Sequence, residues 1–238
     1  MITVDFQRLC IKPGYKILDI GCGSGRHVCE ASRFNQVVSI GADIDLKEVA
    51  QARQRLTWHQ KMGECRGVWG TCVTDITHLP FQADAFDLVI CSEILEHVHD
   101  QGIAVNEIIR VLKPNKNLVV SVPRYLPERI CWALSKEYHT TESGHIRIYK
   151  KRALLDILEG AGVQRWKHHY AHSLHTPYWW LKCLLGVKRN DSILANLYHR
   201  FLVWDMMQKP WITHFLENLL NPIMGKSLVL YLRKGQHA

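Results

Sequence analysis

ILDIGCGSGR, residues 17–26, is the stretch of sequence that decides the fold. Its first half, ILDIG, is typical of a strand, and Gly21, Gly23 and Gly25 then alternate with other residues before a helical segment begins at Arg26. Glycine lets the backbone turn sharply and lets a ligand approach more closely than any Cβ would allow. We therefore predict a ligand-binding turn between a strand and a helix.

A dinucleotide-binding fold is the main rival interpretation of this turn. Its fingerprint requires G-x-G-x-x-G, and Arg26 stands where the third glycine would fall after Gly21 and Gly23. Asp19 also lies two residues before the first glycine, where a carboxylate would repel a pyrophosphate but attract a cationic ligand. The pattern favours a cationic ligand, and a glycine-rich turn that binds nothing is the remaining alternative.

Strand-like and helical segments alternate along the first part of the chain. Runs rich in apolar and β-branched residues predict strands at 16–21, 37–44, 67–75, 86–93, 117–123 and 163–171. Helical spacing of apolar residues predicts helices at 26–34, 46–56, 102–112 and 151–159. Such a series implies a parallel sheet covered by helices on both faces, a doubly wound, Rossmann-like α/β fold.

The character of the sequence changes after residue 171. Helical, aromatic segments at 177–186, 191–208 and 211–220 are followed by a strand at 227–234. We interpret the chain as a core, 1–171, a helical insertion, 172–226, and a closing strand of the core sheet with a tail, 227–238. The expected fold class is thus a seven-stranded α/β sheet with a helical insertion before its final strand.

The composition is that of an ordinary folded domain. The 238 residues are 47% hydrophobic and 22% charged, which excludes a disordered, collagen-like or coiled-coil chain. The eight cysteines form no CxxC pair, and no basic segment leads into an apolar one at the N-terminus, so we expect a reduced, cytoplasmic protein. No apolar run approaches the length of a membrane span.

Two further carboxylates follow predicted strands. Asp43 ends the second strand, eighteen residues after Gly25, where a carboxylate can accept hydrogen bonds from two ribose hydroxyls. Asp45 competes for that role but is better placed as a helix N-cap. Asp75 ends the third strand, where it could accept a hydrogen bond from an adenine amino group while Ile76 lies on the ring. The alternative for Asp75 is a local role as a turn or cap residue.

Together these motifs resemble those of the class I S-adenosylmethionine-dependent methyltransferases, in the branch that contains small-molecule and ubiquinone-biosynthesis enzymes. The matching positions are Asp19, Gly21, Gly23, Gly25, Asp43, TDITHLPFQADAFDLVICSEILEHV (74–98) and RVLKPNKNLVVSVPR (110–124). The resemblance covers residues 10–165 and the closing strand. Asn115 stands where family members usually carry glycine, and asparagine also tolerates a left-handed conformation.

The resemblance implies a fold, a cofactor and a reaction. It implies a sheet whose last strand is antiparallel, bound S-adenosylmethionine, and transfer of a methyl group in line from the sulfonium to an acceptor held in the pocket. The glycine turn, including the backbone at Cys22, and Asp19 would hold the methionine end of the cofactor. The carbonyl of Cys91, at the end of the fourth strand, would accept a hydrogen bond from its amino group.

The string SEILEHV, 92–98, follows the fourth predicted strand and carries candidate acceptor-side groups. A helical turn there would bring Glu93, Glu96 and His97 together, and His145 in SGHIRIY is a candidate to join them. The E-x-x-E-H string is similar to that of ubiquinone-pathway O-methyltransferases and small-RNA 2′-O-methyltransferases, in which it binds a metal. We favour a site without metal, in which Glu93, His97 and His145 shape the pocket or accept the proton of a hydroxyl acceptor.

The insertion combines aromatic residues with positive charge. Residues 150–238 hold 13 Lys and Arg against 5 Asp and Glu, whereas residues 1–149 hold 17 of each. The combination is typical of helices at a membrane interface, and equally of a helical cap over an acceptor pocket. We expect a small or lipid-like acceptor, methylated on oxygen, and a peripheral contact of 172–226 with an anionic membrane. The aromatic and basic residues concerned are Tyr178, Trp179, Trp180, Trp204, Trp211, Lys182, Lys188, Arg189, Arg200 and Lys209.

Two other functions stay open. Metal-assisted RNA 2′-O-methylation would use the E-x-x-E-H string and the basic insertion, but the sequence shows no aromatic and basic RNA-recognition module, so nucleic acid ranks below a small-molecule acceptor. A non-catalytic protein could instead keep the cofactor-binding fold as a scaffold or sensor.

The segment HHYAHSLH, 168–175, contains four histidines. His168 and His172, or His172 and His175, have the spacing of one helical turn and so suggest a metal site. The first of them lie in a predicted strand, however, and no cysteine or carboxylate stands beside them in the sequence. We therefore interpret this segment as a polar rim.

Overall fold

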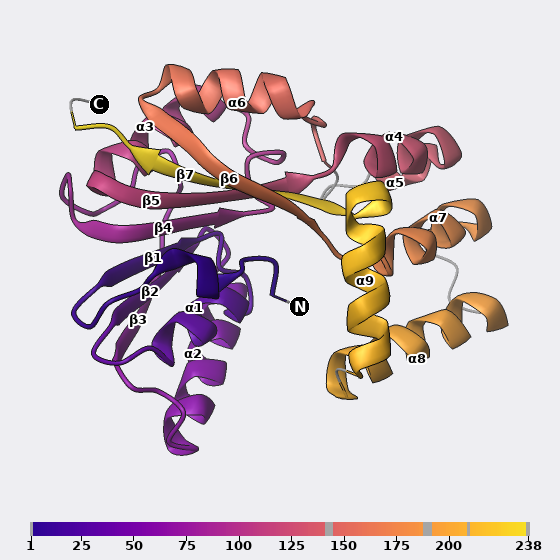
Figure 1. Ribbon diagram of the computed structural model, residues 1–238, viewed down its shortest axis with the longest axis horizontal. Coiled ribbons are helices and arrows are strands. Elements are labelled where there is room, and N and C mark those ends of the chain that lie inside the picture. The colour runs from indigo at the N-terminus through magenta and orange to yellow at the C-terminus, as the bar shows by residue number, and fades with distance from the viewer. Residues whose placement is uncertain (1, 141–144, 188–191, 209, 237–238) are drawn as a thin grey trace.

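The computed structural model describes residues 2–140, 145–187, 192–208 and 210–236. In this part of the chain, seven strands form one sheet in the order β3-β2-β1-β4-β5-β7-β6 (Figure 1). The pairs are parallel except those of β7, which runs antiparallel to both β5 and β6. This confirms the predicted seven-stranded sheet with an antiparallel last strand. The strands are β1 (Lys16–Ile20), β2 (Val38–Asp43), β3 (Val68–Val73), β4 (Phe86–Ser92), β5 (Leu112–Pro123), β6 (Val163–Ala171) and β7 (Ser227–Lys234).

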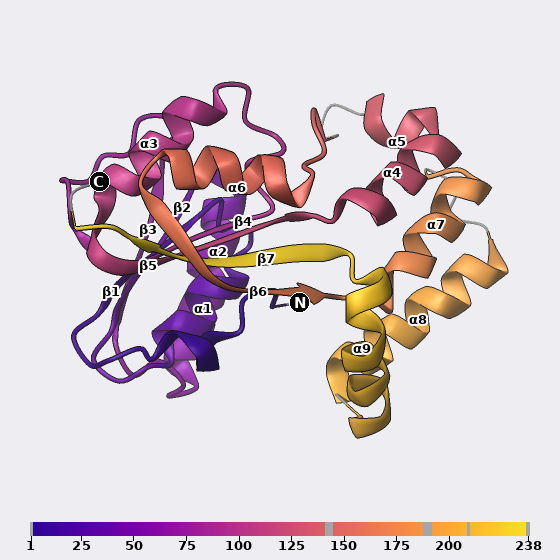
Figure 2. The same ribbon diagram turned by 45° about the horizontal axis from the view of Figure 1, so that its top comes forward.

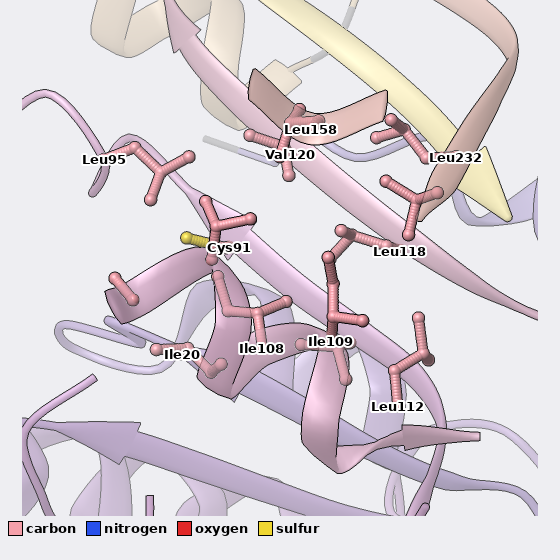
Figure 3. Close-up of a cluster of buried hydrophobic side chains, with 14 of the residues drawn as sticks. Ile20, Cys91, Leu95, Ile108, Ile109, Leu112, Leu118, Val120, Leu158 and Leu232 are labelled. Atoms are coloured by element: carbon pink, nitrogen blue, oxygen red, sulfur yellow. The ribbon is translucent and has the colours of Figure 1, made fainter. Parts of the chain in front are cut away.

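Helices cover the sheet and fill the insertion (Figure 2). Side chains of η1 and α1 pack on one face of the sheet, and side chains of α3 and α6 pack on the other. Figure 3 shows the second of these layers, in which Ile108 of α3 and Leu158 of α6 lie near Val120 of the sheet. The helices are η1 (Phe6–Leu9), α1 (Arg26–Ser32), α2 (Leu46–Lys61), α3 (Gln101–Val111), α4 (Tyr125–Leu134), α5 (Lys136–Thr140), α6 (Lys151–Gly160), α7 (His175–Leu185), α8 (Ile193–Gln208) and α9 (Trp211–Met224).

Helices α4 and α5 occupy a segment for which the sequence predicts no element. Pro127 stands in the first turn of α4, where a proline removes no helical hydrogen bond. The carbonyl of Pro127 accepts a hydrogen bond from the Trp180 indole of α7 at 3.1 Å, so α4 is fastened to the insertion. These two helices therefore link the end of β5 to the helices that precede β7.

Several elements differ from their predicted bounds: α2, for example, continues to Lys61 instead of ending at residue 56, and β5 and α9 are also longer than predicted. Strand β5 begins at Leu112 and includes Asn115, whose φ of 61° is the left-handed conformation expected there. Helix α9 continues to Met224 although the prediction ends it at residue 220, before Pro222. Arg124 donates hydrogen bonds to the carbonyls of Asn221 at 3.2 Å and Pro222 at 2.9 Å, which holds this last turn in place.

The insertion forms a group of helices, α7, α8 and α9, beside α4 and α5 beyond the end of the sheet (Figures 1 and 2). Ser173, between β6 and α7, joins it to α9: its N–H donates to Asn221 Oδ1 at 3.0 Å and its hydroxyl donates to the Glu217 carbonyl at 3.2 Å. The Thr176 hydroxyl donates to the Met224 carbonyl at 2.7 Å. Among the helices of the described residues, none has the length and apolar character needed to cross a membrane.

Asp19, near the end of β1, is a buried carboxyl group with 1% of its surface exposed. Its Oδ2 accepts a hydrogen bond from the Val28 N–H at 3.0 Å, whereas no described residue hydrogen-bonds its Oδ1. Burial raises the pKa of Asp19 to about 7, because the carboxylate would lose its hydration there. Asp19 thus supports the first turn of α1 from beneath, and its protonation is coupled to folding.

Replacement of Asp19 by Asn tests this burial through the pH dependence of stability. The pKa of Asp19 is about 7 in the folded state and 3.8 in the unfolded state. The protonated carboxyl group therefore stabilises the folded protein fully below pH 3.8, and this stabilisation is lost as the pH rises towards 7. Between pH 5 and pH 8, we expect the free energy of unfolding to fall by about 2 to 3 kcal/mol more in the native protein than in Asp19→Asn.

Urea denaturation of both proteins at the two pH values measures this difference. Other titrating groups are common to both proteins and cancel in the comparison. Parallel pH dependence in the two proteins would show that the carboxylate is ionised and hydrated in the folded state.

Candidate functional site

A cavity of about 470 Å³ lies at the carboxyl ends of β1, β2, β3 and β4. Because these strands are parallel, four loops that are distant in the sequence meet at one edge of the sheet. Both carboxylates and apolar side chains line the cavity. No described residue of the insertion, 172–226, contributes to this lining. The lining residues are Ile20, Gly21, Asp43, Ile44, 74–77, Ile94 and 97–100.

The predicted glycine turn connects β1 to α1. Gly21, Gly23 and Gly25 have φ values of 66°, 49° and 87°, all in the left-handed region that other residues rarely adopt. A Cβ at Gly21 would lie 2.1 Å from the Ile94 side chain at the cavity wall, and a Cβ at Gly25 would lie 3.0 Å from the Ala52 Cα of α2. The turn therefore presents bare backbone on one side and packs closely against a helix on the other.

Asp43, at the end of β2, fixes this turn and also faces the cavity. Its Oδ2 accepts a hydrogen bond from the Gly23 N–H at 2.8 Å, and its Oδ1 accepts one from the Asp45 N–H at 3.0 Å. A carboxylate has about four acceptor positions, so two remain for the hydroxyls of a ligand. Asp45 instead caps α2 by accepting from the Lys47 N–H at 2.7 Å, the role preferred for it in the sequence analysis.

Asp75, which follows β3, stabilises a local turn and also lines the cavity. Its Oδ1 accepts a hydrogen bond from the Thr77 N–H at 2.8 Å, which makes it a turn residue. That hydrogen bond also lowers the pKa of Asp75. Asp75 and Ile76 line the same cavity as Asp43, and Ile76 is only 9% exposed. A carboxylate and an apolar side chain are therefore placed together opposite the glycine turn.

Several residues predicted to bind the cofactor lie beneath the cavity surface. Asp19, Cys22 and Cys91 are 1%, 5% and 0% exposed, and they are absent from the described lining, as are Gly23 and Gly25. The Cys22 N–H donates to the Ala42 carbonyl at 3.0 Å, which anchors the turn to β2. The structure gives these residues supporting contacts, and their direct contact with a ligand stays a prediction.

The segment after β4 does not form the predicted helical turn from Glu93. Glu93 has a φ of 58°, which is incompatible with a helix, and its N–H donates to the Ser121 carbonyl at 2.9 Å. The Ser121 hydroxyl donates to Glu93 Oε1 at 2.8 Å, so Glu93 faces β5. A single turn follows, closed by the hydrogen bond from the His97 N–H to the Ile94 carbonyl at 2.9 Å.

Glu96 points into the interior of the protein. It is fully buried, and neither of its carboxyl oxygens has a hydrogen-bond partner among the described residues. Burial raises the pKa of Glu96 well above its ordinary value, and the nearby Glu93 raises it further. Burial also raises the pKa of Glu93. Both groups are therefore shifted towards their neutral forms.

His97 and His145 are brought together as predicted, with their ring centroids 5.0 Å apart. His145 Nδ1 lies 2.5 Å from Oε1 of Glu128, a residue of α4 that is 1% exposed. The Tyr138 hydroxyl of α5 donates to Glu128 Oε2 at 3.4 Å. The sequence analysis missed Glu128, because it predicts no element for this segment and no motif marks the residue. The structure thus adds a buried carboxylate to the acceptor side.

Three of the four candidate metal ligands also gather here. Glu96, His97 and His145 each place a ligand atom within 4.8 Å of the other two. Glu93 is not part of this group, because it is turned towards Ser121. The arrangement can hold either a proton-transfer pair or a metal ion.

The insertion reaches the site through aromatic contacts. The Trp179 ring of α7 lies 5.8 Å from the Tyr138 ring, and the Tyr138 ring lies 6.2 Å from the His145 ring. Lys226 Nζ lies 4.2 Å from the centroid of the Trp179 ring. The insertion therefore contacts Tyr138, and through Tyr138 it supports His145.

Comparison with known proteins gives a family match. A family model described as "Methyltransferase domain" matches residues 11–175. "Cycloartenol-C-24-methyltransferase 1" of Oryza sativa subsp. japonica is 28% identical over 144 residues, which are 59% of this chain and 37% of that protein. "Probable tRNA methyltransferase 9B" of Mus musculus is 30% identical over 164 residues, 68% of this chain and 31% of that protein. The chain thus spans about a third of the length of these curated relatives.

The fold has solved counterparts. The crystal structure of a Bacillus halodurans C-125 protein, provisionally named a methyltransferase, superposes with a TM-score of 0.63 and 19% identity, covering 97% of this chain and 96% of that chain. At this identity the likeness establishes the fold alone, whereas the family model covers more than half of the chain. The chain therefore belongs to the methyltransferase-domain family, the class I methyltransferases that use S-adenosylmethionine as methyl donor.

Proposed function

We propose that this methyltransferase transfers the methyl group to a hydroxyl oxygen of an apolar, lipid-like acceptor. The observation that carries the proposal is the contact of His145 with the buried Glu128 beside His97, next to the cavity. A hydroxyl acceptor must lose a proton, and a histidine held by a carboxylate is suited to remove it.

The cavity residues fit S-adenosylmethionine. Asp43 has acceptor positions left for ribose hydroxyls, Ile76 offers an apolar surface for adenine, and the bare backbone at Gly21 permits close approach. When bound, the cofactor supplies an electrophilic methyl group on a sulfonium, so the leaving thioether is neutral and needs no proton from the protein. The chain's own residues have to orient the two reactants and accept the proton of the acceptor.

Glu128 orients the ring of His145. When its carboxylate accepts a hydrogen bond from His145 Nδ1–H, His145 Nε2 keeps the lone pair that can take a proton. The neutral forms favoured for Glu93 and Glu96 limit the negative charge around this pair. The arrangement is that of an oriented base in a site with few competing charges.

The surface of the insertion supports a lipid-like acceptor. Among the described residues, 15 of the 27 exposed large apolar side chains lie within 184–223. Trp211 is 76% exposed and Trp204 is 49% exposed, which is costly in water for side chains of this size. The name of the rice relative specifies cycloartenol, methylated at C-24, so it bears on the class of acceptor and not on the acceptor atom.

An anionic membrane is the occupant that we propose for this surface. Within 172–226 the chain carries six basic against three acidic side chains, so the insertion as a whole has a positive net charge. Arg200 of α8 lies among the exposed apolar groups, whereas Lys188, Arg189 and Lys209 lie outside the described residues. Membrane contact would bring the enzyme to acceptors that are dissolved in lipid.

Metal-assisted methylation of RNA is a second candidate function. It is favoured by the grouping of Glu96 with His97 and His145, because the buried oxygens of Glu96 have no hydrogen-bond partner among the described residues. The name of the mouse relative specifies tRNA. Here a divalent ion held by these residues would lower the pKa of the attacking hydroxyl.

Label transfer from radioactive S-adenosylmethionine separates the two candidates. With total cell extract as the source of acceptors, we expect label in the organic-solvent fraction, at a rate that a chelator leaves unchanged. His145→Gln should lower that rate by about 100-fold or more through loss of the base, and Glu128→Gln should lower it less. His78→Gln, at an exposed histidine outside the cavity lining, is the control and should retain the native rate.

Label that appears only in RNA and is abolished by the chelator would favour the second candidate and contradict the first. An organic-fraction rate that is unaffected in His145→Gln would remove the proposed base.

Substitution of Asp43 by Ala should weaken cofactor binding. It removes the acceptor of ribose hydroxyls and leaves the Gly23 N–H without its partner, so we expect a loss of about 1 to 3 kcal/mol, or about 5- to 150-fold in the dissociation constant. Calorimetric titration with S-adenosylhomocysteine measures it. Asp45→Ala removes the cap of α2 and should cost about 1 kcal/mol of stability without changing that affinity. Equal affinities in all three proteins would refute the role of Asp43.

Vesicle flotation tests the membrane contact. The native protein should float with vesicles that contain phosphatidylglycerol and bind less to vesicles of phosphatidylcholine alone. A double variant with Trp204→Ser and Trp211→Ser should lose most of this binding, because these side chains supply exposed aromatic surface. Trp58→Ser, at a 54% exposed position on α2, is the matched control. Binding that is equal for both lipids, or unchanged in the double variant, would exclude the proposed contact.

A further inference from the structure

We propose that His172, His175 and Glu217 form a binding site for a divalent transition-metal ion, with Zn²⁺ as the best fit, at the base of the insertion. Each of the three offers a ligand atom within 4.8 Å of the other two. His172 follows β6, His175 begins α7, and Glu217 lies within α9. The interpretation of this histidine segment as a polar rim rested on the lack of a nearby carboxylate, and the fold supplies one from a distant part of the chain.

The distances within this trio suit ligands of one ion better than direct hydrogen bonds. His172 Nδ1 lies 3.8 Å from Glu217 Oε1, which is too long for a hydrogen bond. Nitrogen and oxygen ligands bound at about 2.0 to 2.1 Å from a tetrahedral Zn²⁺ are roughly 3.3 Å apart, so only a small contraction is needed. His175 Nδ1 is buried and has no hydrogen-bond partner among the described residues. A metal ion would give that nitrogen a partner.

Neighbouring groups hold the trio in place. His172 is 7% exposed, and its Nε2 lies 3.3 Å from the Thr3 hydroxyl. In metal-binding histidines, a contact of this kind to the nitrogen that does not bind the metal orients the ring. His172 also has a φ of 66°, an unfavourable conformation for a residue other than glycine that calls for an explanation. The hydrogen bond from the Ser173 hydroxyl to the Glu217 carbonyl fixes α9 against this turn.

The chemistry of the trio selects the class of ion. Two imidazoles and one carboxylate, without a thiolate, are a common ligand set for Zn²⁺ that leaves a fourth position open. His172 and Glu217 line a cavity of about 570 Å³ that gives an ion access and leaves room for a water molecule.

The ion would fasten the insertion to the core. It would join α7 and α9 to the turn that follows β6, next to Thr3. The trio shares no residue with Glu96, His97 and His145, so the two groups can be tested separately.

Metal titration of the full-length protein, freed of metal with a chelator, tests this site. Zn²⁺ is titrated in competition with a chromophoric chelator, and Co²⁺ alone serves as a spectroscopic probe of tetrahedral coordination. We expect saturable binding, and a loss of affinity of at least about tenfold in Glu217→Gln and in His175→Gln. His168→Gln lies in the same cavity but outside the trio, and Glu96→Gln reports on the other group, so both should bind as the native protein does.

Two further measurements need no altered protein. Zn²⁺ should raise the melting temperature of the native protein, because the ion binds only the folded trio. It should also protect His175 from diethyl pyrocarbonate, as read by peptide mapping. The proposal is overturned if the native protein shows no saturable binding, if both ligand variants bind as the native protein does, or if Glu96→Gln alone abolishes binding.

Discussion

The hydrogen bond from the Gly23 N–H to the Asp43 carboxylate, at 2.8 Å, is the interaction on which the donor side depends. It ties the turn after β1 to the end of β2, and the turn can take this path only because Gly21, Gly23 and Gly25 are left-handed. A side chain at the third glycine would meet the backbone of α2, and one at the first would meet Ile94. The positions of α1, α2 and the cavity wall therefore follow from one constrained segment of backbone.

The acceptor side faces a different physical problem, which is the burial of several carboxyl groups in a small volume. The pKa values of Glu93 and Glu96 are raised, which favours their neutral forms, whereas Glu128 contacts His145. Lys226 contributes a positive charge nearby, and its own pKa is lowered by burial. Of the buried acids in this site, Glu128 is the one in contact with the His145 ring, whereas Glu93 and Glu96 are shifted towards their neutral forms.

The sequence predicts the glycine turn and several residues that line the cavity, because the determinants of these features are local. The spacing of the glycines, and the positions of Asp43 and Asp75 at strand ends, can be recognised without knowledge of the fold. Glu128 and Glu217 escape such analysis, because their partners, His145 and His172, come from other elements and only the packing of α4 and α9 brings them close. The turn after β4 was mispredicted for a related reason: the left-handed conformation of Glu93 goes with its contacts to β5, which no helical spacing reveals.

The insertion connects the exposed apolar surface of α8 and α9 to the proposed base. Trp179 packs on Tyr138, whose hydroxyl donates to Glu128, the residue that holds His145. The exposed apolar groups lie mainly on α8 and α9, whereas α7 carries the contact with Tyr138. An acceptor that arrives at the outer helices therefore meets the same structural unit that supports the base. The cavity, in contrast, is lined by the ends of core strands and the turns that follow them, and by no described residue of 172–226, so displacement of the insertion would disturb the proposed proton removal while leaving cofactor binding intact.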